Sequence, residues 1–163
     1  MASILGVDKI QHTNGTDAIT IDSTGRIHTP ARPSIFADCS TGASAAYVTV
    51  SNGAAVQFVN KISGSGITLS SATFTVPVAG LYQINASFLN NNEENMEFSL
   101  KLNSAYALVA FQSDERRINM SHAMELSAND TIQFINTSGY NLGVHRNTDA
   151  TDRYTAVSMY LVG

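Results

Sequence analysis

The fold is decided by the stretch Ala72-Thr-Phe-Thr-Val-Pro-Val-Ala-Gly-Leu-Tyr-Gln-Ile-Asn-Ala86. In its first half, Phe74, Val76 and Val78 fall on one face of an extended chain, and the threonines between them fall on the other. Proline and glycine then break the run, because proline cannot donate to a strand ladder and glycine permits a sharp bend. Alternation restarts at Leu81. The stretch therefore predicts two strands that meet at a corner, as in an all-β sandwich.

Similar short apolar patterns recur along the rest of the chain, separated by turn residues. No window of helical length carries a convincing apolar stripe with a period of about 3.6 residues. Further strands are expected at residues 35–37, 47–50, 56–59, 96–102, 106–111, 118–126, 131–135 and 154–162. Short strands at intervals of about ten residues are typical of a β-sandwich or jelly roll.

The composition suits one ordinary domain with a small appendage, and it restricts the partners. The chain has 163 residues, of which 44% are hydrophobic and 13% are charged; the charged share is about half the usual one. A net charge of −4 and a pI near 5.4 argue against a nucleic-acid partner. No apolar run approaches the roughly 20 residues of a membrane span, and no signal peptide is recognisable. The single Cys39 excludes an intrachain disulfide, so we expect folding in a reducing cytoplasm.

Residues 1–33 differ in character from residues 34–163, and we interpret them as an N-terminal arm that precedes a head domain. A hairpin is expected around the turn at residues 22–25, before Pro30 and Pro33 end it. So short a segment cannot bury its own aliphatic side chains. The arm either packs on its own domain or is an anchoring arm that lies on another protein or intertwines with sister chains, and we favour the second interpretation. The side chains expected to make the anchoring contact are aliphatic: Ile4, Leu5, Val7, Ile10, Ile19, Ile21 and Ile27.

No set of residues predicts catalysis, a metal site or a cofactor. The histidines are scattered and lack metal-ligand spacing: His12, His28, His122 and His145. Asp149 and Asp152 offer carboxylates for a calcium loop, but their spacing matches no dedicated calcium motif. Serine, histidine and aspartate occur without the G-x-S-x-G context of a nucleophile elbow. We therefore expect a protein that is not an enzyme and that needs no cofactor.

The head resembles a known family in several places. Residues 74–82 resemble the signature strand pair of the complement component 1q globular head, a tumour-necrosis-factor-like jelly roll. Residues 98–103, 126–134 and 154–161 resemble the central strand of that family, its leucine–turn–aspartate–strand element and its last buried strand. The resemblance covers residues 34–163 and implies a jelly-roll β-sandwich of about ten strands that forms a homotrimer. The core or the three-fold seam would then contain Phe74, Tyr82, Phe98, His122, Phe134 and Tyr160.

The arm has a second resemblance. Residues 5–11, 15–26 and 30–33 are similar to the start of many tailed-phage virion proteins, notably those of marine and cyanobacterial phages. This resemblance implies a virion structural protein, made in the host cytoplasm: a trimeric capsid decoration, or cement, knob on the particle surface. Its arm would bind the major capsid protein or another virion protein.

An alternative within the same resemblance is a tail fibre or receptor-binding tip whose loops recognise the host surface, for instance a surface glycan. The secreted animal members carry a signal peptide and a collagen Gly-X-Y stalk, which are not seen in this sequence, so their roles are poor guides here. An enzyme such as a depolymerase is the least favoured class, because no carboxylate pair or triad stands in a suitable context.

Overall fold

The computed structural model describes residues 6–29, 31–39, 46–91, 95–107, 111–113, 116–145 and 154–162. The chain divides into two compact units, Met1–Arg32 and Pro33–Gly163. Every regular element among the described residues is a β-strand. No helix in this part of the chain has the length and apolar character that crossing a membrane would require.

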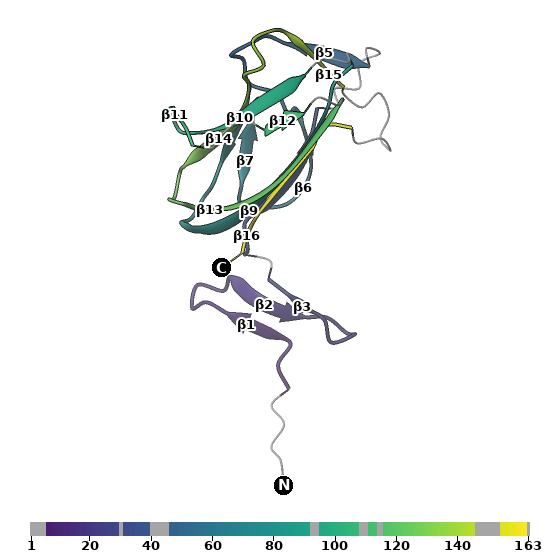
Figure 1. Cartoon of the computed structure of the whole chain (residues 1–163). Helices are drawn as coiled ribbons and strands as arrows, with labels where there is room; N and C mark the ends of the chain where they lie inside the picture. Colours follow the sequence, from purple (N-terminus) through teal and green to yellow (C-terminus); the bar gives the residue numbers. More distant parts are fainter. Residues whose placement is uncertain are drawn as a thin grey trace. The chain divides into compact units, whose positions relative to one another are not determined.

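The first unit is a small antiparallel sheet of order β1-β2-β3 (Figure 1). Its strands are β1 (Lys9–Gln11), β2 (Asp17–Ile21) and β3 (Ile27–His28). The expected hairpin is β2 with β3, and the structure adds β1 to it. The turn between β1 and β2 contains Gly15, whose φ of +86° lies in a region that side-chain-bearing residues rarely adopt.

The first large sheet of the second unit has the order β13-β9-β16-β4-β6, and all its neighbouring strands are antiparallel. Its strands are β4 (Ser34–Asp38), β6 (Asn60–Ser63), β9 (Gly80–Leu89), β13 (Arg117–Leu126) and β16 (Ala156–Leu161). Figure 1 shows the long curved strands β9, β13 and β16 running beside one another. The sheet carries the strict alternation that the sequence shows after Leu81, with every second residue of β9 buried.

The second large sheet has the order β11-β10-β14-β8-β7, and β12 pairs with the edge of β10 opposite to β14. Its strands are β7 (Thr68–Ser70), β8 (Thr73–Thr75), β10 (Met96–Leu102), β11 (Ala105–Tyr106), β12 (Phe111–Ser113) and β14 (Thr131–Asn136). A separate two-stranded sheet joins β5 (Tyr47–Val50) to β15 (Leu142–His145). The described residues of this unit therefore form a sandwich of two large sheets with a small accessory sheet.

Aromatic side chains join the two large sheets across the core. Phe88 of β9 stacks on Phe98 of β10, with ring centroids 4.2 Å apart. Phe134 of β14 lies 5.5 Å from Phe88 and 6.3 Å from Phe74, again between ring centroids. All four rings have no exposed surface. Such clusters contribute pairwise aromatic contacts in addition to the area they bury, which fixes the separation and register of the sheets.

The Pro/Gly corner predicted within residues 72–86 lies between β8 and β9. Phe74 and Val76 are fully buried, but Val78 is 43% exposed. The prediction that Val78 shares their face was wrong, because β8 ends at Thr75 and the chain bends at Pro77 and Val78. The Tyr82 hydroxyl donates to the Val78 carbonyl at 2.9 Å, which holds the bend against the start of β9.

Two further strand predictions were wrong in their pairing. Residues 56–59 form no strand, although Val56 and Phe58 are fully buried. Their amide groups instead donate singly to the carbonyls of Phe134 and Ser71. Residues 106–111 are not one continuous strand, because β11 ends at Tyr106 and β12 begins at Phe111; residues 108–110 lie outside the described residues.

The first and last strands of the head domain, β4 and β16, lie next to each other. Ser34 of β4 pairs with Tyr160 of β16, and the amide of Leu161 donates to the carbonyl of Pro33 at 3.0 Å. Gly64 packs against this point, since a Cβ at its position would lie 2.6 Å from the Cα of Ile35. Its φ of +104° excludes most other residues as well. The entry of the chain into the sandwich is therefore tightly packed.

Candidate interaction surfaces

One face of the β13-β9-β16-β4-β6 sheet points away from the aromatic core. On β9, Tyr82, Ile84 and Phe88 point inward and are fully buried, so the residues between them point outward. The strand register places outward residues of neighbouring strands directly beside one another. We call the central part of this surface the open sheet face; it comprises Phe36, Gln83, Asn85, Ser87, Asn119, Ser121, Ala156, Ser158 and Tyr160. Two charged residues of β13, Arg117 and Glu125, lie on the same side of the sheet at the two ends of the strand.

The centre of the open sheet face is an uncharged hydrogen-bond network that crosses three strands. Gln83 Nε2 donates to Ser121 Oγ at 2.9 Å, and Ser121 Oγ donates to Asn85 Oδ1 at the same distance. Asn85 Nδ2 donates to Ser158 Oγ at 3.3 Å. Because these amides and hydroxyls bond to each other, they can be removed from water at lower cost than unpaired polar groups. The network is suited to a buried contact.

A shallow hollow of about 320 Å³ lies beside this network. Its lining is uncharged and contains both apolar and amide groups: Phe36, Asn85, Ala86, Ser87, Asn119, Met120, Ala156 and Ser158. Tyr160 stands on the same face and is 42% exposed. An exposed tyrosine, a half-buried phenylalanine and the absence of charge in this central region are features expected at the desolvated centre of a protein interface.

The arm has an amphipathic sheet. Ile10 pairs with Ile19, and Ile21 pairs with Ile27, so the four side chains share one face. We call this set the isoleucine face. Ile10 is 53% exposed, Ile21 38% and Ile27 69%. Val7 is also exposed, and Ile4 and Leu5 lie outside the described residues.

Asp22 holds the turn between β2 and β3. Its Oδ1 accepts from the Thr24 hydroxyl at 2.7 Å and from the Arg26 amide at 3.0 Å. Its Oδ2 lies 2.7 Å from Arg26 Nε and 3.2 Å from His28 Nε2. These hydrogen bonds, that of the Thr24 hydroxyl first, lower the pKa of Asp22 well below its ordinary value of 3.8. The ionised Asp22 carboxylate therefore stabilises the turn between β2 and β3.

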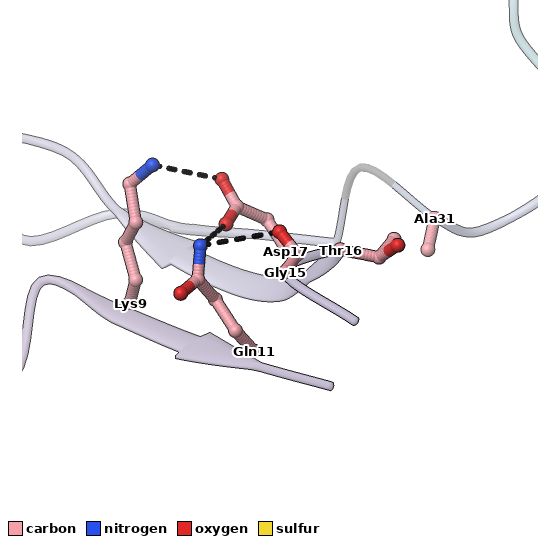
Figure 2. Close-up of a pocket in the computed structure, with 6 residues that line it drawn as sticks. All are labelled: Lys9, Gln11, Gly15, Thr16, Asp17 and Ala31. Atoms are coloured by element: carbon pink, nitrogen blue, oxygen red, sulfur yellow. Dashed lines mark hydrogen bonds and ion pairs between the residues drawn. The ribbon is translucent and has the colours of Figure 1, made fainter. Parts of the chain in front are cut away.

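Figure 2 shows a second polar cluster in the arm, at an open hollow of about 400 Å³. Lys9 Nζ lies 3.0 Å from Asp17 Oδ2, and the Gln11 side-chain amide donates to Asp17 Oδ1. The hydrogen bond from Gln11, and then that from Lys9, lowers the pKa of Asp17. The ionic groups are paired with one another across β1 and β2, so they brace the sheet.

A partly buried histidine lies at the end of the accessory β5–β15 sheet. His145 ends β15, and its ring meets that of Tyr154 edge-on at a centroid distance of 5.5 Å. Burial first, and then the positive charge of Arg116, lowers the pKa of His145. Nearby Asn90, fully buried, has no hydrogen-bond partner for its side-chain amide in the part of the chain that the structure describes. We assign this cluster no chemistry.

The structure distributes the predicted packing residues over three environments. Phe74, Tyr82, Phe98 and Phe134 lie in the core. His122 of β13 is half-buried, and Tyr160 stands exposed on the open sheet face. Among the described residues, no group of three histidine, cysteine or carboxylate side chains could hold a metal ion. Asp149 and Asp152, considered for calcium, lie outside them.

The residues that the sequence analysis missed are those of the polar network. Gln83 and Asn85 fall on the outward half of the alternation that begins at Leu81, and the sequence analysis singled out neither Ser121 nor Ser158. One signal was present: the outward positions of β9 between Leu81 and Leu89 carry no charge, although outward strand positions facing water usually do. This uncharged outward run of β9 is the local sequence feature that accompanies the polar network.

Comparisons with known proteins establish the fold and nothing finer. No family model matches the chain, and no curated protein matches it. Among solved structures, Eiger TNF from S. frugiperda matches with a TM-score of 0.62 at 14% identity, covering 81% of this chain and 93% of that one. The globular domain of zebrafish complement 1qA matches at 0.61 and 14%, covering 80% and 98%. Murine APRIL matches at 0.62 and 10%, covering 80% and 99%.

These likenesses confirm that the head is a jelly roll of the tumour-necrosis-factor and complement-1q kind. The described residues of the second unit contain thirteen strands, several of only two or three residues. At such low identity the neighbours share an architecture with this chain, and function has to be argued from its own surfaces.

Proposed function

We propose that the chain is a non-enzymatic virion structural protein, a homotrimeric knob that decorates a bacteriophage capsid and is held there by its N-terminal arm. One observation carries the proposal: a jelly-roll head whose open sheet face is uncharged at its centre is preceded, in the same chain, by a separate small sheet with exposed isoleucines. The sequence resemblance of the arm to tailed-phage virion proteins supplies the capsid context.

The open sheet face supports self-association of the head. It spans four adjacent strands and joins an aromatic rim, Phe36 and Tyr160, to an internally bonded amide and hydroxyl centre. Identical faces meeting around a three-fold axis would bury these groups without burying a charge, which avoids the largest desolvation cost at an interface.

The arm supplies the attachment. A trimer presents three arms, so the second and third contacts form at a high effective concentration once the first is made. Each fully buried aliphatic side chain stabilises a contact by roughly 1.5–3 kcal/mol before the cost of ordering. Repeated over a shell, a modest contact per arm ties neighbouring capsid subunits together. Catalysis is not required at any step of this function.

The second candidate is a tail fibre or receptor-binding tip, because an arm of this kind could attach equally to a baseplate. The two functions differ in stoichiometry. A decoration protein is present in hundreds of copies per particle, and a tail appendage in a few dozen or fewer. Quantitative mass spectrometry of purified virions, with the major capsid protein as the internal reference, separates them.

The attachment itself is tested by deleting residues 1–29. We expect the shortened protein to remain a folded trimer and to lose binding to virions that lack the wild-type chain, measured by co-sedimentation. Thermal unfolding of the shortened protein is the control that the head is intact. Virion binding that survives the deletion would sink the proposed anchoring role of the arm.

A further inference from the structure

The isoleucine face of the arm requires a cover. Its four side chains are aligned by strand pairing, and Ile27 is 69% exposed in the single chain. The other side of the same sheet is polar: Lys9, Thr20 and His28 lie in one cross-strand row, and the Asp22 carboxylate contacts His28. A sheet with one apolar and one charged face is built to bury the apolar one.

The available area limits what can cover it. A fully buried aliphatic side chain contributes roughly 60–120 Å² of apolar surface, so four contribute less than about 500 Å² per arm. A stable interface between separate proteins buries about 800 Å² per partner. The isoleucine face is therefore too small to hold a separate partner by itself. It can be buried stably only against a surface that other contacts already hold beside it.

The topology brings sister arms to such a place. β3 ends at His28 and β4 begins at Ser34, a gap of five residues that spans at most about 20 Å. Ser34 pairs with Tyr160, which stands on the open sheet face. In a trimer built on that face, the three arms consequently start from the edge of the shared interface.

We propose that the isoleucine faces of the three sister arms pack against one another and form a second, small core on the trimer axis. This inference rests on the proposed homotrimer. It moves the isoleucines from the capsid contact, to which the proposed function assigned them, to self-association of the arms, so that the polar side of the arm sheet is left to meet the capsid. The head interface and the arm interface then reinforce each other, because each raises the effective concentration of the other.

The test is amide hydrogen exchange on the purified full-length protein, with sedimentation at the same concentration. We expect a trimer in which the amides of β2 are protected. Ile27→Asn should accelerate exchange in β2 by about 10- to 100-fold, the factor expected from losing one buried aliphatic side chain. Ile27→Val should retain protection. Ala18→Asn, an exposed position of β2 that alternates with Ile19 and Ile21, should also retain it.

The outcomes are distinct. A trimer whose arms exchange fast and do not respond to Ile27→Asn overturns the inference and leaves the proposed trimer standing; the isoleucine face is then free for the capsid protein. A monomeric full-length protein overturns the proposed trimer and the inference together. Loss of protection in Ile27→Asn alone supports sister-arm packing.

Cross-linking provides a second measurement that does not depend on arm stability. Ile27→Cys should give covalent dimers within the trimer on mild oxidation, at a rate independent of protein concentration. Ala18→Cys should give none, because its side chain points to the opposite face. The native Cys39 is only 2% exposed and serves as the background in the unmodified protein. Equal cross-linking in both variants would overturn the inference.

Discussion

The Tyr82 hydroxyl donates a 2.9 Å hydrogen bond to the carbonyl of Val78, four residues upstream, and so locks the corner from which β9 starts. Burial raises the pKa of Tyr82 above its ordinary value of 10.0, so the hydroxyl remains a donor throughout the neutral range. The bond converts a local Pro/Gly break into a defined change of direction. It thereby sets where the open sheet face begins.

Removing this bond should destabilise the head without altering its fold. Tyr82→Phe keeps the buried ring and loses the hydroxyl, so we expect the free energy of unfolding to fall by about 0.5–1.5 kcal/mol. Denaturant titration measures the change. Tyr106→Phe is the matched control, because Tyr106 is 59% exposed, and its effect should lie within the error. An equal loss in the two variants would show that the corner bond contributes nothing.

Gly64 should be the least replaceable glycine of the head. A Cβ there meets the backbone of Ser34 and Ile35, and φ is +104°. We expect Gly64→Ala to lower the free energy of unfolding by about 2–4 kcal/mol, through strain and displacement of β4. Gly53→Ala shares the positive φ, at +79°, but has nothing within 4 Å, so it should cost about 1 kcal/mol. Thermal unfolding of the two variants makes the comparison.

The aromatic core should be sensitive at Phe134, which is fully buried among Phe58, Phe74 and Phe88. We expect Phe134→Ala to cost about 3–5 kcal/mol, because the ring leaves a cavity between two sheets. Phe36→Ala removes a half-buried ring from the open sheet face. Its main effect should be on assembly rather than on unfolding of the dissociated chain. Denaturation and sedimentation of both variants separate core from interface.

A charge on the open sheet face should dissociate the trimer. Gln83→Lys places an ammonium in the hydrogen-bond network, where burial without a partner costs several kcal/mol. We expect the assembly to weaken by at least about 100-fold, as measured by sedimentation velocity across a dilution series. The control is Gln133→Lys on the outer face of the other sheet, where Gln133 Nε2 bonds Thr73 Oγ1 at 2.9 Å. If only Gln133→Lys dissociates, the trimer interface lies on the β11-β10-β14-β8-β7 sheet and the proposed interface is wrong.

The arm should lose its structure in acid. Because the pKa of Asp22 is lowered in the folded state, its contribution is fully present above pH 3.8 and is lost as the pH falls from 3.8 toward the folded-state value. The protection factors of the β2 and β3 amides, which compare the observed exchange rate with the intrinsic rate at the same pH, should therefore fall below about pH 4 in the wild type. Asp22→Asn should show fast exchange already at neutral pH and a weaker dependence on acid. Asp8→Asn, outside this turn, should behave like the wild type.

The sequence predicted burial better than it predicted pairing. Alternation along β9 and β10 identified the buried Tyr82 and Phe98 because a period of two is imposed directly by strand geometry. At residues 56–59 the same kind of pattern wrongly predicted a strand, although Val56 and Phe58 are buried. Burial depends on side-chain direction, whereas ladder formation also requires a neighbouring backbone at the right spacing.

The partners in the hydrogen-bond network of the open sheet face could not be predicted from sequence patterns. Asn85 meets Ser121 and Ser158, which are 36 and 73 residues away along the chain. Only the register of β9 against two other strands creates that network, and no local pattern encodes the register. The arm was easier: Asn14-Gly15 and the Asp22–Gly25 segment are turn signals that act within a few residues.

The hydrogen bond between Leu161 and Pro33 has a practical consequence for protein engineering. Entry and exit of the head are adjacent, so the sandwich can be grafted into a loop of a host protein without stretching either junction. The same adjacency makes circular permutation feasible: a short linker can join the old ends, and new ends can open at the exposed Asn52–Gly53 turn. The head domain can therefore be transferred between proteins as a single unit.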